Sequence, residues 1–75
     1  MTKLKNDLSI NDLELGNQIL ITDILEIEDT LGWKNGDVLK IISIEEDYER
    51  IEVKEDGEKL SEFIYIHEFG GIRKV

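Results

Sequence analysis

The chain has 75 residues, of which 40% are hydrophobic and 36% are charged; it contains no cysteine, and its formal net charge is −9. A chain of this length forms one small hydrophobic core, and without disulfides it depends on dense apolar packing or on oligomerisation. The negative charge disfavours nucleic acid and anionic membranes as partners and favours basic surfaces.

The residue composition predicts a mainly β chain. Twelve Ile, nine Leu and three Val stand beside no Ala and no Pro. β-branched residues favour strands, and the strongest helix former is missing. No apolar run approaches the roughly 18 residues of a membrane span, and no signal-like apolar segment follows the first residues, so we expect a cytoplasmic protein.

The chain begins with a segment whose polarity alternates poorly. We expect residues 1–12 to form an irregular N-terminal arm and residues 13–75 to form a single domain. After a turn signal at Gly16 and Asn17, residues 18–22 predict a first strand, buried on both faces.

Residues 23–32 allow two interpretations. Asp23 and Glu26 have capping-box spacing, and Ile24, Ile27 and Leu31 recur at helical steps, which predicts one short helix near residues 24–31. Alternatively the first strand continues to residue 27 and residues 28–33 form a long loop. The sequence leaves both interpretations open.

The second half of the chain alternates between strands and turns. Asn35 and Gly36 predict a tight turn with positive φ at the glycine, and residues 38–44, 48–54, 60–66 and 71–75 predict four further strands. Residues 56–57 supply a second turn of this kind. The predicted core consists of alternating strand residues: Ile19, Ile21, Leu39, Ile41, Ile51, Val53, Phe63 and Tyr65. Five short strands in a chain of this size suit a small barrel.

The stretch from Leu31 to Ile44, followed by an acidic turn, a strand and residues 63–66, resembles the diverging turn and later strands of SH3-like barrels. Leu31, Trp33, Lys34, Gly36 and Asp37 match the turn motif of that family. The resemblance covers residues 18–75 and implies a small five-stranded SH3-like barrel, similar to bacterial and prophage proteins of this type. The residues with which eukaryotic SH3 domains bind proline-rich peptides have no counterpart in this chain.

A second resemblance covers residues 14–54, which look like the swapped-hairpin domain of AbrB-type proteins. It is carried by residues 14–16, 19–22, 26–27, 30–32 and 36–37. This resemblance implies the alternative function, a dimeric DNA-binding transcriptional regulator or antitoxin. Acidic residues stand where that family's phosphate-binding basic residues would be.

No pattern of catalytic or metal-binding residues is present in the sequence. The single histidine, His67, has no serine in a nucleophile motif to activate, and its neighbour Glu68 would face the opposite side of a strand. With no cysteine ligands, no acidic loop of EF-hand type and no phosphate-binding glycine motif, we expect no catalytic residues, no metal and no cofactor.

The densest chemical feature is an acidic segment at residues 45–58, which contains eight acids and two bases. It is either a solvated hairpin that prevents edge-to-edge aggregation or a surface that presents carboxylates to a basic groove of a partner protein. The candidate partner-binding residues are Trp33, Glu45, Glu46, Asp47, Tyr48, Glu49, Glu52, Glu55 and Asp56. For Trp33 the alternative is packing in the core.

These observations lead to one functional hypothesis. The chain is a non-enzymatic, acidic protein-binding module, monomeric or a small homo-oligomer, that docks on a basic, nucleic-acid-binding surface of another protein. A phage or mobile-element inhibitor of a nucleic-acid-handling enzyme fits this description.

Overall fold

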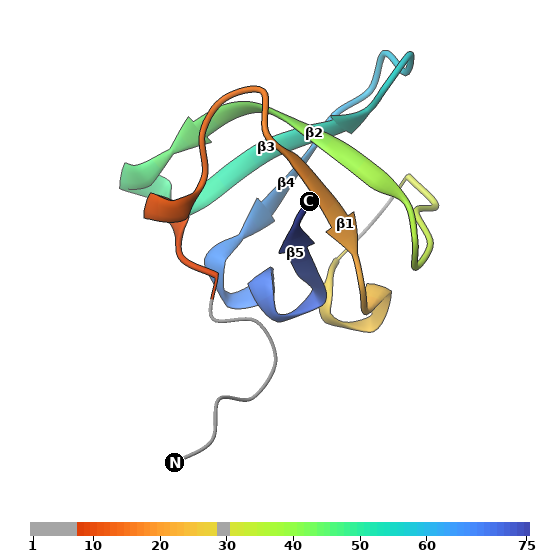
Figure 1. The fold of residues 1–75 in the computed structure, drawn as a ribbon, viewed down its shortest axis with the longest axis horizontal. Coiled ribbons are helices and arrows are strands. Elements are labelled where there is room, and N and C mark those ends of the chain that lie inside the picture. Colours follow the sequence, from red (N-terminus) through yellow and green to blue (C-terminus); the bar gives the residue numbers. More distant parts are fainter. Residues whose placement is uncertain (1–7, 29–30) are drawn as a thin grey trace.

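The computed structural model describes residues 8–28 and 31–75, which form five strands and four 3-10 turns (Figure 1). The strands are β1 (Gln18–Ile21), β2 (Val38–Glu45), β3 (Arg50–Glu55), β4 (Glu62–Tyr65) and β5 (Ile72–Lys74). The turns are η1 (Ile10–Asp12), η2 (Ile24–Glu26), η3 (Glu46–Tyr48) and η4 (Ile66–Gly71). The prediction of a mainly β chain with five short strands is confirmed.

The five strands make one antiparallel sheet in the order β4-β3-β2-β1-β5, and the sheet curls into a half-barrel (Figure 1). Its inner face carries the buried side chains, and its outer face is open to solvent. β4 and β5 are the outermost strands, and η4 joins them in sequence. The β2–β3, β3–β4 and β4–β5 connections are short, as expected for a small antiparallel domain, whereas residues 22–37 separate β1 from β2.

Eight aliphatic side chains are at most 1% exposed and form the centre of the core: Ile19, Ile21, Leu39, Ile41, Ile51, Val53, Ile64 and Ile72. The alternation predicted for β3 is confirmed, with Ile51 and Val53 inside. β1 is buried on one face only, because no second layer covers its outer face. Gln18 is exposed and Leu20 half-buried, so the prediction that both faces are buried is wrong.

In β4 the predicted orientation is wrong. Ile64 is completely buried, whereas Phe63 and Tyr65 lie half-buried on the outer face. Residues 63–66 are all apolar or aromatic, so their polarity cannot indicate which face is buried. The inward position goes to the β-branched aliphatic residue, and the tyrosine hydroxyl stays within reach of polar partners on the outer face.

A register shift in β2 determines which of its side chains face the core. β2 pairs with β3 through Ile41 and Val53, and the next paired residue is Ser43, opposite Glu52. The intervening Ile42 is the extra residue of a β-bulge, and it is 39% exposed. The bulge reverses the alternation. Ile44 therefore packs against the core, and Glu45 reaches the outer face.

The ambiguous segment after β1 is a single 3-10 turn. β1 ends at Ile21, and η2 follows with the side chain of Asp23 accepting a hydrogen bond from the Leu25 amide. Ile27 is buried, while Leu25 is 90% exposed. Neither a two-turn helix nor a continued strand forms in the described residues of this segment, and residues 29–30 lie outside them.

The predicted turn at Gly36 is confirmed, with φ at +95°. This conformation strains any residue with a Cβ, which explains the glycine. The Gly36 amide donates to the Ile21 carbonyl at 2.7 Å, and the Ile24 amide donates to the Asn35 side chain at 2.7 Å. The turn therefore fixes the end of β1 and the start of η2.

The turn η4, which was not predicted, fastens the open side of the half-barrel. Its Glu68 is only 3% exposed and accepts hydrogen bonds from the amides of Tyr65, at 3.0 Å, and Glu28, at 2.8 Å. The carbonyl of Gly71 accepts bonds from the amides of Thr22 and Asp23. η4 thereby joins β4 to the segment that follows β1.

The start of the described chain packs on the domain. Leu13 is buried, Leu8 and Ile10 are partly buried against the core, and the Lys74 ammonium donates to the Asp12 carbonyl at 3.1 Å. The side chain of Ser9 caps η1. Residues 8–12 of the predicted arm are therefore ordered against the domain, and its residues 1–7 lie outside the described ranges.

Ile51→Ala should lower the free energy of unfolding by about 2 to 5 kcal/mol, because it leaves a cavity in the centre of the core. Ile42→Ala, the same change at the exposed bulge position, should cost about 1 kcal/mol or less. Urea denaturation of both variants measures this difference. A loss below about 1 kcal/mol at Ile51 would mean that β3 does not face the core.

Gly71→Ala should destabilise the protein by about 1 to 3 kcal/mol, because the new methyl group has no space. A Cβ at this position would lie 2.5 Å from the Asp23 carbonyl oxygen and 3.0 Å from the Glu26 Cβ. Gly70→Ala is the matched control, since its nearest neighbour would be 3.9 Å away. Equal thermal stability of the two variants would contradict the close contact between η2 and η4.

Candidate functional site

The predicted acidic site is divided between two ends of the sheet. Residues 45–49, here called the β2–β3 turn, lie at one end of β3, and residues 55–58, the β3–β4 turn, lie at the other (Figure 1). A six-residue strand is about 20 Å long, so Glu55 and Asp56 are far from Glu46 and Asp47. Glu52 lies between them, and its carboxylate accepts a hydrogen bond from the Ser61 hydroxyl.

The β2–β3 turn presents its acids to solvent. Glu46, Asp47 and Glu49 are exposed, and none of them forms an ion pair with a basic side chain of the described residues. Tyr48 is 66% exposed and belongs to η3, although its strand was predicted to begin there. Glu49 has a left-handed backbone, and its carbonyl accepts from the Ile66 amide at 2.9 Å, which fixes the turn to the start of η4.

Beside this turn, the outer face of the sheet carries a group of four side chains, here called the aromatic–arginine cluster: Tyr48, Arg50, Phe63 and Tyr65. The guanidinium carbon of Arg50 lies 3.8 Å from the ring centre of Phe63, 4.8 Å from that of Tyr48 and 5.8 Å from that of Tyr65. A cation over an aromatic face is attracted by the negative charge of the ring's quadrupole. Three of the chain's five aromatic residues thus surround one cation on a solvent-facing surface.

Polar contacts fix the position of Arg50. Its Nε donates to Glu45 Oε1 at 2.6 Å, and its Nη1 donates to the Tyr65 hydroxyl at 3.0 Å. These two hydrogen bonds, that to Glu45 first, raise the pKa of the guanidinium above its ordinary value, so Arg50 stays charged at every pH at which the protein folds. Glu45 is in cross-strand register with Arg50, and its negative charge is balanced by this ion pair.

Trp33 does not belong to this surface. It is only 5% exposed and lies with Leu31, Glu55, Glu58 and Leu60 around a cavity of about 70 Å³. Its indole is part of the core and has almost no area to offer a partner. Of the predicted candidates, the structure therefore brings together Glu45, Glu46, Asp47, Tyr48 and Glu49, and separates from them Trp33, Glu55 and Asp56. Glu52 lies in register with Phe63, at the margin of the cluster.

Arg50, Phe63 and Tyr65 were not predicted from the sequence as members of a site. Arg50 alternates with Ile51, which indicated an outward side chain, but its neighbours depend on pairing between strands. The register aligns Arg50 with Tyr65 and Glu52 with Phe63, and it cannot be read from residues 63–66, which are all apolar or aromatic. Aromatic residues at positions 63 and 65 flanking an outward Arg50 would have been the signal.

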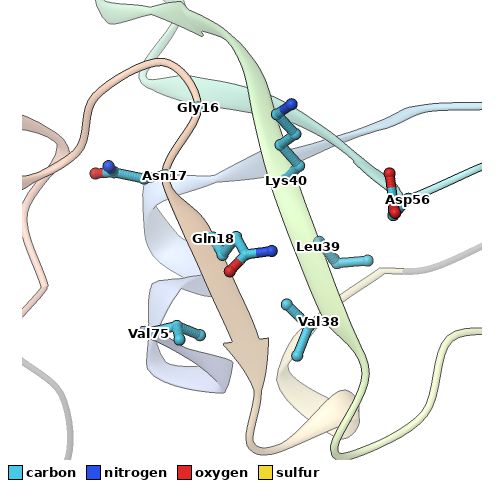
Figure 2. A pocket seen from close by; sticks show the side chains of 8 residues that line it. All are labelled: Gly16, Asn17, Gln18, Val38, Leu39, Lys40, Asp56 and Val75. Atoms are coloured by element: carbon cyan, nitrogen blue, oxygen red, sulfur yellow. The ribbon is translucent and has the colours of Figure 1, made fainter.

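A second concave region lies on the outer side of β1 and β2 (Figure 2). It has a volume of about 400 Å³ and is lined by Gly16, Asn17, Gln18, Val38, Leu39, Lys40, Asp56 and Val75. Figure 2 shows Lys40 on β2, Asp56 in the turn that follows β3, and Gln18 extending from β1 toward β2. Its polar side chains are few and have mixed charge, and they do not converge on one point, so no ligand chemistry follows from them.

The remaining chemistry of the described residues is sparse. His67 is exposed and stacks on Tyr65, with ring centres 6.0 Å apart, and no serine hydroxyl hydrogen-bonds to it in the described ranges. Among residues 8–28 and 31–75, no three His, Asp or Glu side chains gather as ligands for a metal ion. No helix in those same ranges is long and apolar enough to cross a membrane.

Comparison of the chain with models of protein families, with curated proteins and with solved structures found no match. The resemblances to SH3-like barrels and to AbrB-type domains therefore rest on the residues quoted for them.

Arg50→Lys should lower the melting temperature, because an ammonium group keeps the charge but loses the planar stacking on Phe63 and the hydrogen-bond geometry to Glu45 and Tyr65. Arg73→Lys is the matched control: Arg73 is exposed on β5 and should tolerate the exchange without a measurable change. Thermal denaturation followed by circular dichroism compares the two. An unchanged melting temperature for both would mean that the cluster does not hold the outer face of β3 and β4 together.

Proposed function

We propose that this chain is a non-enzymatic binding protein that docks on a basic surface of a partner protein through the β2–β3 turn and the adjoining aromatic–arginine cluster. The observation that carries the proposal is the exposure of three unpaired carboxylates directly beside a solvent-facing group of three aromatic rings and one arginine. We also propose that the fold is of the small SH3-like type found in bacterial and prophage proteins.

Residue type supports a protein–protein contact at this surface. Tyrosine and arginine are enriched among the residues that dominate binding energy at interfaces, because they combine large contact area with polar tips. Tyr48 and Tyr65 lie next to Arg50, whose side chain is held in one position by Glu45. A side chain that is already fixed loses little entropy when a partner packs on it.

Charge supports a basic partner. The three free carboxylates of the β2–β3 turn add to a chain of net charge −9, so a basic surface is attracted over a distance comparable to the Debye length. Carboxylates on a small protein can occupy a groove that otherwise receives phosphates. A protein of this kind would inhibit a nucleic-acid-binding partner by competing for the groove.

Two triple variants with the same net charge test the proposal. One neutralises the β2–β3 turn through Glu46→Gln, Asp47→Asn and Glu49→Gln. The other neutralises the β3–β4 turn through Glu55→Gln, Asp56→Asn and Glu58→Gln. Each removes three negative charges from the chain's net charge of −9, so a general charge effect is equal in both.

The partner is captured from host lysate, and its association rate with each variant is measured at low and high salt. Neutralising the β2–β3 turn should slow association roughly 3- to 10-fold and weaken its salt dependence, whereas the β3–β4 variant should stay close to wild type. Equal rates for wild type and the β2–β3 variant would reduce these acids to a solvated face. A salt-dependent shift of duplex DNA by the wild type would favour the AbrB-type alternative instead.

A further inference from the structure

The β2–β3 turn contains a hollow whose lining combines apolar, aromatic and acidic groups. It has a volume of about 560 Å³ and is lined by Ile44, Glu45, Glu46, Asp47 and Tyr48. Ile44 contributes a partly buried aliphatic wall, and Tyr48 is 66% exposed. The volume exceeds what one water molecule occupies by more than tenfold, so a long side chain of a partner fits inside it.

The neighbouring surface already holds a guanidinium group in a comparable environment. Arg50 lies against Phe63 and Tyr48, with Glu45 accepting its Nε hydrogen bond at 2.6 Å. Of the acids that line the hollow, Arg50 forms an ion pair with Glu45 alone. Glu46 and Asp47 lie at the same hollow without a basic partner among the described residues.

Backbone hydrogen bonds fix the turn that carries these acids. The Glu49 amide donates to the Glu46 carbonyl at 3.1 Å, and the Glu49 carbonyl accepts from the Ile66 amide at 2.9 Å. The turn is therefore closed on itself and fastened to the start of η4. Carboxylates on a fixed turn bind a cation with less loss of backbone conformational entropy than carboxylates on a loose loop.

We infer that this hollow receives an arginine side chain of the basic partner and prefers arginine to lysine. The inference rests on the proposed function and adds the identity of the recognised side chain. The incoming guanidinium stacks on the exposed ring of Tyr48 and donates to the carboxylates of Glu46 and Asp47. Ile44 contacts the aliphatic part of the same side chain.

The preference for arginine follows from the shape and hydration of the two cations. A guanidinium is planar and weakly hydrated, stacks on an aromatic face and donates two parallel hydrogen bonds to a carboxylate. An ammonium is a compact, strongly hydrated charge, which loses more hydration when it approaches a ring. Net charge alone would attract both equally, so the difference between them reports the contacts that only a guanidinium makes, which are the stacking on Tyr48 and the paired hydrogen bonds to a carboxylate.

Two synthetic peptides of equal length and equal charge test the inference, one alternating Arg with Gly and the other alternating Lys with Gly. Their affinities for the full chain are measured by fluorescence anisotropy at low and at moderate salt. The Arg-Gly peptide should bind roughly 3- to 10-fold more tightly than the Lys-Gly peptide, and the ratio should persist when salt weakens both.

Substitutions at Tyr48 test whether its aromatic ring causes the preference for arginine. Tyr48→Phe keeps the aromatic face and should retain the ratio of affinities. Tyr48→Leu keeps an apolar side chain and should lower the ratio, leaving only the part that the paired hydrogen bonds to the carboxylates supply. Leu60→Ala is the control, because Leu60 is 65% exposed near the opposite end of β3 and should leave both affinities unchanged. Thermal denaturation verifies that each variant is folded.

The possible outcomes separate this inference from the function on which it rests. Equal affinities for the two peptides, both reduced by Glu46→Gln with Asp47→Asn, would overturn the arginine preference and leave docking on a basic surface intact. An arginine preference as large in Tyr48→Leu as in the wild type would also overturn the assignment to this hollow. Failure of both peptides to bind at low salt would overturn the proposed function together with the inference.

Discussion

The pairing of β2 with β3, interrupted by one extra residue, determines both the core and the candidate site. Without the bulge at Ile42, continued alternation would turn Ile44 outward and Glu45 toward the apolar interior. An unpaired carboxylate there would have to be desolvated, at a cost of several kcal/mol. With the bulge, Ile44 packs on the core and Glu45 meets Arg50 across the strands. The same irregularity therefore completes the hydrophobic core and assembles the outer cluster.

A sheet this small also has to fasten its two outermost strands. Glu68 in η4 does this for β4, because its two carboxylate oxygens accept hydrogen bonds from the amides of Tyr65 and Glu28, which lie 37 residues apart in the chain. Because Gly71 has no side chain, η2 can approach it closely. The Gly71 carbonyl then accepts hydrogen bonds from the amides of Thr22 and Asp23. These contacts hold Tyr65 at the end of β4, and Tyr65 in turn accepts a hydrogen bond from Arg50. The position of Tyr65 in the candidate surface thus depends on the hydrogen bonds that η4 makes with β4 and with the segment after β1.

How much could be predicted from the sequence depends on whether polarity changes along a segment. β3 alternates between charged and aliphatic residues, so its inner face was predictable, as was the glycine turn at Gly36. In β4 only Glu62 is charged and residues 63–65 are apolar or aromatic, so the orientation of this strand was fixed by pairing rather than by pattern. The acids of residues 45–58 are close in sequence but are separated in space by the length of β3. The role of Glu68 could not be predicted from the sequence, because its hydrogen-bond partners come from two distant segments.

The functional proposal joins three properties of one surface: free carboxylates, an exposed aromatic ring and an arginine held in place by its neighbours. The most direct test is to map, by NMR on isotope-labelled protein, which backbone amides shift when the alternating Arg-Gly peptide is added. We expect the largest shifts at residues 44–50 and 63–66, which form the β2–β3 turn and the strand beside it. Shifts centred on residues 55–60, or spread evenly over all acidic positions, would contradict a defined docking site at the β2–β3 turn.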